Sequence, residues 1–109
     1  MSQRVVLARA AKRDIEAIWR FIAENDSAEN ANRVLVALQG TIKRLTGLPS
    51  RGNVPKELLA LGNTEYREAH FKPYRIIYQV TADAVTVYGV FDGRRDMLTL
   101  LKDRLLRPR

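Results

Sequence analysis

The sequence of 109 residues contains no cysteine and a single histidine, His70. Without cysteine the chain has no disulfide framework, no thiolate nucleophile and no cysteine-based metal site. With one histidine, a metal centre would have to be built almost wholly from carboxylates. We therefore expect no metal and no other cofactor.

Long apolar runs are also missing. The N-terminus, MSQRVVLARAAKRD, meets a charge within every few residues, and no later run approaches the roughly 18 apolar residues that cross a bilayer. We therefore expect a cytoplasmic protein. Apolar residues make up 46% of the chain and charged residues 28%, which is typical of a folded protein. The length predicts one domain over residues 1–109.

Acidic residues are scarce relative to basic ones. The chain has 12 Asp and Glu against 19 Lys and Arg, which gives a net charge of +7 and a pI near 10.2. Residues 1–42 carry a net charge of +1 and residues 43–109 a net charge of +6. This excess predicts an anionic partner, such as nucleic acid, an acidic protein segment or a membrane surface, that binds the second half.

The first half predicts a strand followed by two helices. Residues 4–8, RVVLA, are rich in β-formers. Over residues 10–25 one apolar stripe repeats at helical spacing and consists of Ile15, Ile18, Trp19 and Ile22. Ser27 is a good N-cap for a second helix that continues to Gly47. The short connection predicts an antiparallel helical hairpin.

The second half predicts a loop, three strands and a helix. The expected segments are a loop over 48–63 with a helical turn at 57–61, strands at 64–70, 74–81 and 84–91, and a helix at 96–106 capped by Asp96. The predicted fold is therefore α+β, with a helical hairpin packed on an antiparallel sheet in the order β-α-α-β-β-β and a short C-terminal helix.

Four stretches together resemble a known family. They are DIEAIWRFIA at 14–23, LPSRG at 48–52, YRIIYQV at 74–80 and VYGVFDGRRDM at 87–97. In this combination the chain resembles the RelE/ParE superfamily of type II toxins, small cytoplasmic proteins that stop growth unless an antitoxin holds them. The resemblance implies a toxin of a plasmid-stabilisation module with no membrane partner. Its partner would be a cognate antitoxin, typically a small DNA-binding dimer with an acidic tail, in a toxin–antitoxin hetero-oligomer.

The superfamily has two functional branches. One resembles ribonucleases that cut mRNA on the ribosome, and the other, named for ParE, resembles proteins that poison DNA gyrase without nuclease activity. By motif position, the phosphate-binding set of the ribonuclease branch matches Arg67, Arg75 and Arg95. Ala69 stands where that branch has a second lysine, and Leu101 stands where its terminal tyrosine falls.

A ribonuclease also needs a group that accepts a proton, and arginine stays protonated at neutral pH. His70 is the remaining candidate base. Alternation along a regular strand places His70 on the face opposite Arg67, unless a bulge near Pro73 reverses this parity. On a regular strand the catalytic set is incomplete.

Three interpretations follow. The favoured one is a non-enzymatic toxin that binds DNA gyrase and is neutralised by its antitoxin. The alternative is a ribosome-dependent mRNA endonuclease that uses Arg67, Arg75, Arg95 and His70. The second alternative is a non-toxic basic module that binds nucleic acid.

The predicted binding surface lies on the face of the sheet that the hairpin leaves uncovered. Its target- or antitoxin-binding residues are Arg67, Lys72, Arg75, Arg94 and Arg95. The structural alternative is that these arginines form ion pairs with Glu65, Glu68, Asp92 or Asp96. The apolar stretch at 98–106, LTLLKDRLL, either closes the core or offers an apolar flank to a partner.

Overall fold

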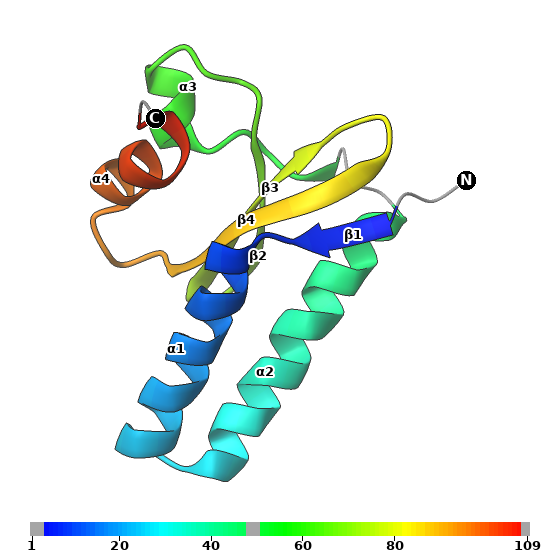
Figure 1. Ribbon diagram of the computed structural model, residues 1–109. Helices are drawn as coiled ribbons and strands as arrows, with labels where there is room; N and C mark the ends of the chain where they lie inside the picture. The colour runs from blue at the N-terminus through cyan, green and yellow to red at the C-terminus, as the bar shows by residue number, and fades with distance from the viewer. Residues whose placement is uncertain (1–3, 48–50, 108–109) are drawn as a thin grey trace.

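The computed structural model describes residues 4–47 and 51–107, which form a four-stranded sheet with helices on both faces (Figure 1). In chain order the elements are β1 Arg4–Leu7, α1 Arg9–Asn25, α2 Ala28–Lys43, the 3₁₀ turn η1 Arg44–Thr46, α3 Lys56–Ala60, β2 Arg67–Phe71, β3 Tyr74–Val80, β4 Ala84–Asp92, α4 Met97–Leu101 and the π-helical turn η3 Lys102–Leu106. The predicted order is confirmed. Residues 48–50 of the predicted loop lie outside the described part, and α3 confirms the predicted helical turn.

The strands lie in the order β1-β4-β3-β2. The pairs β2–β3 and β3–β4 are antiparallel as predicted, whereas β1 pairs with β4 in the parallel direction. The sheet is therefore mixed. The hairpin separates β1 from the other strands, so no tight turn imposes an antiparallel direction on it.

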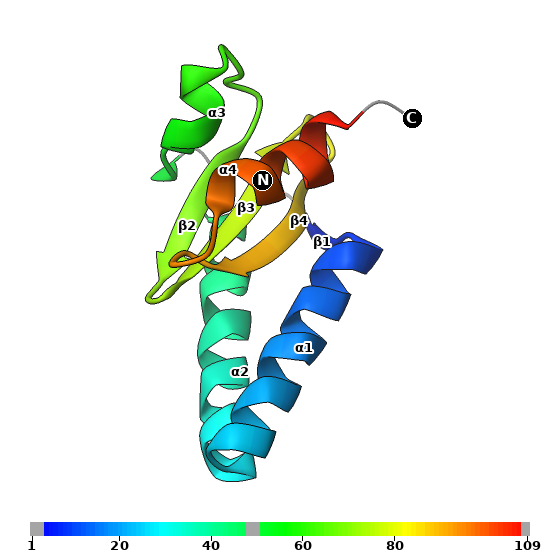
Figure 2. The same cartoon turned by 90° about the vertical axis from the view of Figure 1, so that its left-hand side faces the viewer.

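The hairpin of α1 and α2 packs on one face of the sheet. Ser27 caps α2 as predicted, because its hydroxyl accepts a hydrogen bond from the Asn30 amide at 3.0 Å. The core on this face contains Ala11, Ile15, Val34, Leu38, Ile42, Leu45, Ile76, Tyr78, Val85, Val87 and Val90. Figures 1 and 2 show that the closed end of the hairpin extends well beyond the strands. Among the described helices, none is both long and apolar enough to cross a membrane.

The opposite face is covered by α3 and α4, which correct the expectation of an uncovered sheet face. A second core forms there from Leu58, Ile77, Phe91, Met97 and Leu101. Because alternation points Ile77 and Phe91 away from the hairpin, this face also needs apolar cover. Asp96 caps α4 as predicted, since its carboxylate accepts a hydrogen bond from the Thr99 amide at 3.2 Å.

Candidate functional site

Arg67 and Arg75 lie on opposite faces of the sheet. Arg67 shares its face of β2 with Ala69, which packs against the hairpin core. Arg75 shares its face of β3 with Ile77, which belongs to the core under α3 and α4. The expectation that the arginines converge on one surface is therefore wrong, because the strand register sends the two side chains in opposite directions.

Arg75 is enclosed by two carboxylates, and its side chain is only 13% exposed. Two of its guanidinium nitrogens donate to the two oxygens of Glu57 at 2.7 and 2.9 Å, and Nε donates to Glu68 Oε1 at 2.6 Å. The hydrogen bonds from Arg75 lower the pKa of Glu57. The pKa of Arg75 is raised, chiefly by its hydrogen bonds to Glu57 and also by those to Glu68. The pairing with Glu68 was one of the predicted structural alternatives. Arg75 thus fastens α3 to the sheet.

His70 lies beside this cluster. Its Nε2 is 3.3 Å from Glu68 Oε1, and about half of the side chain is exposed. The β2–β3 register is regular, and the irregularity in the sheet lies between Ile77 and Tyr78 in the pairing with β4. The prediction that His70 points away from Arg67 is therefore confirmed. The structure does not bring together the four residues of the predicted ribonuclease site.

Arg67 anchors the segment that precedes α3. Its NH1 donates to the Gly52 carbonyl at 2.7 Å, and the Gly52 amide donates to the Tyr78 hydroxyl at 3.2 Å. The Glu68 amide donates to the Asn53 carbonyl at 2.8 Å, so this segment is tied along the outer edge of β2. Arg67 is committed to this structural contact.

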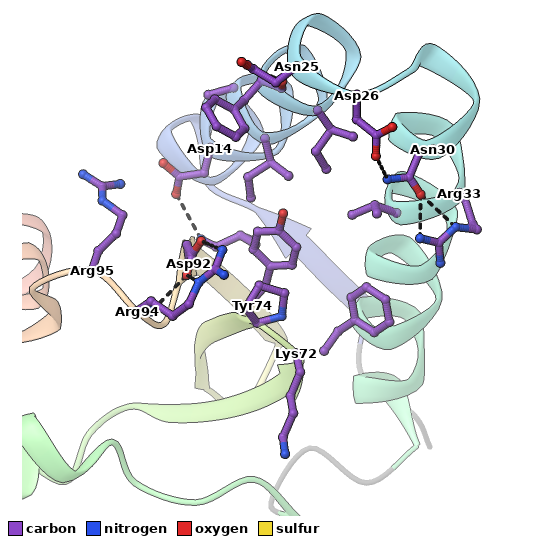
Figure 3. A pocket seen from close by; sticks show the side chains of 18 residues that line it. Asp14, Asn25, Asp26, Asn30, Arg33, Lys72, Tyr74, Asp92, Arg94 and Arg95 are labelled. Atoms are coloured by element: carbon purple, nitrogen blue, oxygen red, sulfur yellow. Dashed lines mark hydrogen bonds and ion pairs between the residues drawn. The ribbon is translucent and has the colours of Figure 1, made fainter.

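The other three predicted cations, Lys72, Arg94 and Arg95, lie together at one end of the sheet. There they line a groove of about 820 Å³ between the hairpin and the turn that joins β2 to β3 (Figure 3). The structure therefore places part of the predicted binding set in one site, on the hairpin side of the sheet.

The groove has an apolar floor. Its apolar lining comes from α1, α2 and the ends of the strands and consists of Ala17, Ile18, Phe21, Ile22, Val34, Phe71, Pro73, Tyr74 and Val90. Phe21 is 68% exposed, although it is one of the largest apolar side chains in the chain. The closed end of the hairpin extends beyond the sheet (Figures 1 and 2), and Phe21 belongs to the C-terminal part of α1, which leads to that end.

Two carboxylates of the groove are already neutralised. Asp14 accepts from Arg104 at 2.9 Å and from the Val90 amide at 3.0 Å. Asp92 accepts from Arg94 at 2.6 Å, and this hydrogen bond lowers the pKa of Asp92. The Arg94–Asp92 pair was also predicted as a structural alternative.

The cations at the margins of the groove outnumber its remaining carboxylates. Lys72 and Arg95 are exposed, and within residues 4–47 and 51–107 their side chains make no hydrogen bond or ion pair. Figure 3 shows them at separate margins of the groove. Arg33 donates to the Asn30 side chain, which in turn donates to Asp26. Among the described residues, Asp26 is the only acid of the groove without a cationic partner. The groove therefore favours an anionic ligand.

Sequence reasoning missed the groove itself. The apolar stripe of α1 predicts correctly which side of that helix faces α2 and the sheet. Phe21 falls outside that stripe, and an aromatic residue on the polar side of an amphipathic helix is a signal that could have identified the site.

Comparison with known proteins identifies the family. A family model described as the ParE toxin of the type II toxin–antitoxin system parDE matches residues 5–97. Toxin ParE3 of Caulobacter vibrioides is 24% identical over 98 residues, which cover 90% of this chain and 94% of that protein.

Two solved structures have a similar fold. A chain of the chromosomal ParDE toxin–antitoxin system from P. aeruginosa superposes with a TM-score of 0.73 at 14% identity and covers 84% of this chain and 96% of its own. A chain of the toxin–antitoxin complex RelBE2 from Mycobacterium tuberculosis gives a TM-score of 0.62 at 19% identity, with 84% and 92% covered. Because the family model spans most of the sequence, this chain belongs to the ParE toxin family of type II toxin–antitoxin systems.

Proposed function

We propose that this toxin is neutralised by an acidic, amphipathic segment of a cognate antitoxin that binds in the groove, and that it stops growth by binding DNA gyrase. Membership of the ParE toxin family supports the first part, as do the solved relatives, which come from a ParDE system and a RelBE2 complex. Its place of action would be the cytoplasm, within a plasmid-stabilisation module.

The antitoxin assignment depends on one observation: the groove has an apolar lining that includes an exposed aromatic residue, and two cations without an ion pair among the described residues lie at its margins. Phe21 and its neighbours offer a surface for the apolar side of a helix or extended segment. Lys72 and Arg95 offer charge-assisted contacts to acidic side chains on that segment. An acidic antitoxin tail with apolar residues at intervals would have the required chemistry.

The state of the arginines supports action by binding. A phosphate clamp needs accessible guanidinium groups, and a ribonuclease needs a nearby proton acceptor. Arg75 is enclosed by Glu57 and Glu68, and Arg67 is bonded to the Gly52 carbonyl on the other face. Arg95 lies at the groove. These positions favour the gyrase-binding branch over the ribonuclease branch.

A supercoiling assay tests the target. Purified toxin is added to DNA gyrase, and we expect inhibition of supercoiling or gyrase-linked DNA breaks. Primer extension on mRNA from cells that express the toxin is the companion measurement. Cuts within translated codons, without an effect on gyrase, would replace the proposal with the ribonuclease alternative. Strongly salt-dependent binding to any duplex without growth arrest would instead favour the nucleic-acid-binding module.

A pair of matched variants tests the groove. Phe21→Glu and Val36→Glu each place a carboxylate on the hairpin at an exposed apolar position, 68% and 67% exposed, but only Phe21 lines the groove. The probe is the product of the reading frame next to the toxin gene, co-expressed with each variant. We expect rescue from growth arrest with wild type and Val36→Glu, and a loss of rescue with Phe21→Glu. Equal rescue of both variants would contradict the assignment of the groove.

A further inference from the structure

A second exposed apolar surface lies on the far side of the sheet from the hairpin. It is formed by α3 and α4, which lie side by side in both views (Figures 1 and 2). We call it the α3–α4 ridge and define it by Leu59, Leu61, Leu98, Lys56 and Lys102. Leu59 is 56% exposed and Leu98 is 44% exposed.

The core does not require these exposed leucines. The second core is closed by Leu58 from α3 and by Met97 and Leu101 from α4. Leu59 and Leu98 are not part of that core and lie among the exposed large apolar residues. Both alternatives predicted for the stretch at 98–106 therefore apply. Leu101 closes a core, and Leu98 and Leu106 leave an exposed apolar flank.

Each helix of the ridge pairs an exposed leucine with an exposed lysine. Lys56 and Leu59 are three residues apart on α3, and Leu98 and Lys102 are four residues apart along α4 and its continuation. Residues at these spacings share one side of a helix. The ridge thus presents apolar centres flanked by positive charge.

The two lysines of the ridge are exposed. In the described part of the chain, Lys56 and Lys102 make no ion pair. The carboxylate next to Lys56 in sequence, Glu57, is directed inward to Arg75. The complementary partner is an acidic protein surface with an apolar centre. Leu58 of α3 is buried in the second core, which holds α3, and with it the ridge, against the sheet.

We propose that the α3–α4 ridge is the surface through which the toxin binds its protein target. This inference rests on the proposed function and assigns the antitoxin and the target to different surfaces. The two surfaces adjoin at Arg95, which lines the groove and directly precedes Asp96, the N-cap of α4.

Two double variants and a control test the ridge. Leu59→Glu with Leu98→Glu removes its apolar centres, and Lys56→Glu with Lys102→Glu reverses its charge at exposed positions. Val36→Glu with Gln39→Glu is the control, because it adds two carboxylates to an exposed part of α2 outside both surfaces. The readouts are growth arrest on expression, inhibition of purified DNA gyrase and the thermal unfolding midpoint.

We expect each ridge variant to need at least about tenfold more protein than the control for half-inhibition of gyrase, with an unchanged unfolding midpoint. Both ridge variants acting like the control would overturn the inference. Should the leucine variant fail to fold, the charge-reversed variant decides alone.

The outcomes also separate this inference from the proposed function. A wild-type chain that stops no growth overturns both. If the wild-type protein stops growth but does not inhibit gyrase, gyrase is not the target, and growth arrest becomes the readout for the ridge variants. In that case loss of arrest in the ridge variants supports the ridge, and retained arrest overturns it.

Discussion

The two faces of the sheet use charge in opposite ways. On the α3 and α4 face, Arg75 is enclosed by two carboxylates beside a core of five apolar residues. On the hairpin face, the core is larger, but it ends in an open groove where Lys72 and Arg95 are unpaired among the described residues. A basic composition therefore predicts an anionic partner but does not locate its site, because some of the cations are structural.

The largest expected effect comes from the buried cluster. Arg75→Met leaves Glu57 and Glu68 close together without their cation, and we expect the free energy of unfolding to fall by about 3–5 kcal/mol. Urea denaturation measures this change. If the free energy of unfolding falls no more than for substitution of an exposed arginine, the contrast between the two faces is wrong, because the cluster would then add little to stability.

A smaller effect is expected where the chain before α3 approaches β2. A Cβ at Gly52 would lie 2.5 Å from the Glu68 carbonyl oxygen and would also collide with the Tyr78 hydroxyl. We expect Gly52→Ala to lower the free energy of unfolding by about 1–3 kcal/mol through overpacking.

Gly62→Ala is the control for this variant. Gly62 has φ of 77° and no atom within 4 Å of its Cβ position, so the substitution causes backbone strain without a collision. We expect it to cost about 1 kcal/mol. A Gly52→Ala variant as stable as wild type would show that this segment is loosely held.

The next effect depends on pH. Hydrogen bonds with Arg75 lower the pKa of Glu57 below its ordinary value of 4.5. The stability that Glu57 contributes is therefore present above pH 4.5 and is lost as the pH falls through the lower, folded-state pKa. At pH 7 we expect Glu57→Gln to lower the free energy of unfolding by about 1 kcal/mol, and we expect this difference to shrink below pH 4.5. Urea titrations between neutral and acidic pH test it, and a difference that grows on acidification would contradict the assignment.

The smallest effect is expected at the margin of the groove. Arg94 is highly exposed and pairs with Asp92 in solvent, so we expect Arg94→Gln to leave the thermal unfolding midpoint unchanged. The comparison with Arg75→Met then sharpens the contrast between an exposed pair and an enclosed one. A large shift for Arg94→Gln would remove that contrast.

Strand alternation and helix periodicity predicted much of the fold. The order of elements, the caps at Ser27 and Asp96 and the opposed directions of Arg67 and His70 all follow from local rules, and the structure confirms them. The parallel pairing of β1 could not be derived, because the hairpin that separates it from the other strands leaves its direction open.

The roles of the predicted arginines and the position of the groove were harder to predict, because they depend on contacts that are not local. Glu57 lies 18 residues from Arg75, and their pairing depends on how α3 lies across the sheet. The covered sheet face follows from the same placement of α3 and α4. The groove exists because the closed end of the hairpin extends beyond the strands (Figures 1 and 2). The sequence pattern predicts the lengths of the two helices, but it does not predict how far they extend past the sheet.

The most direct test of the account is growth arrest by a toxin whose buried cluster has lost its charges. The variant combines Arg75→Met with Glu57→Gln and Glu68→Gln, so that no unpaired charge is left inside and the fold is retained. An unfolding midpoint close to that of wild type confirms the fold. Because Arg75 has a structural role, we expect the folded variant still to stop growth. A folded variant that no longer stops growth would contradict it, because Arg75 would then act on the target or on RNA directly.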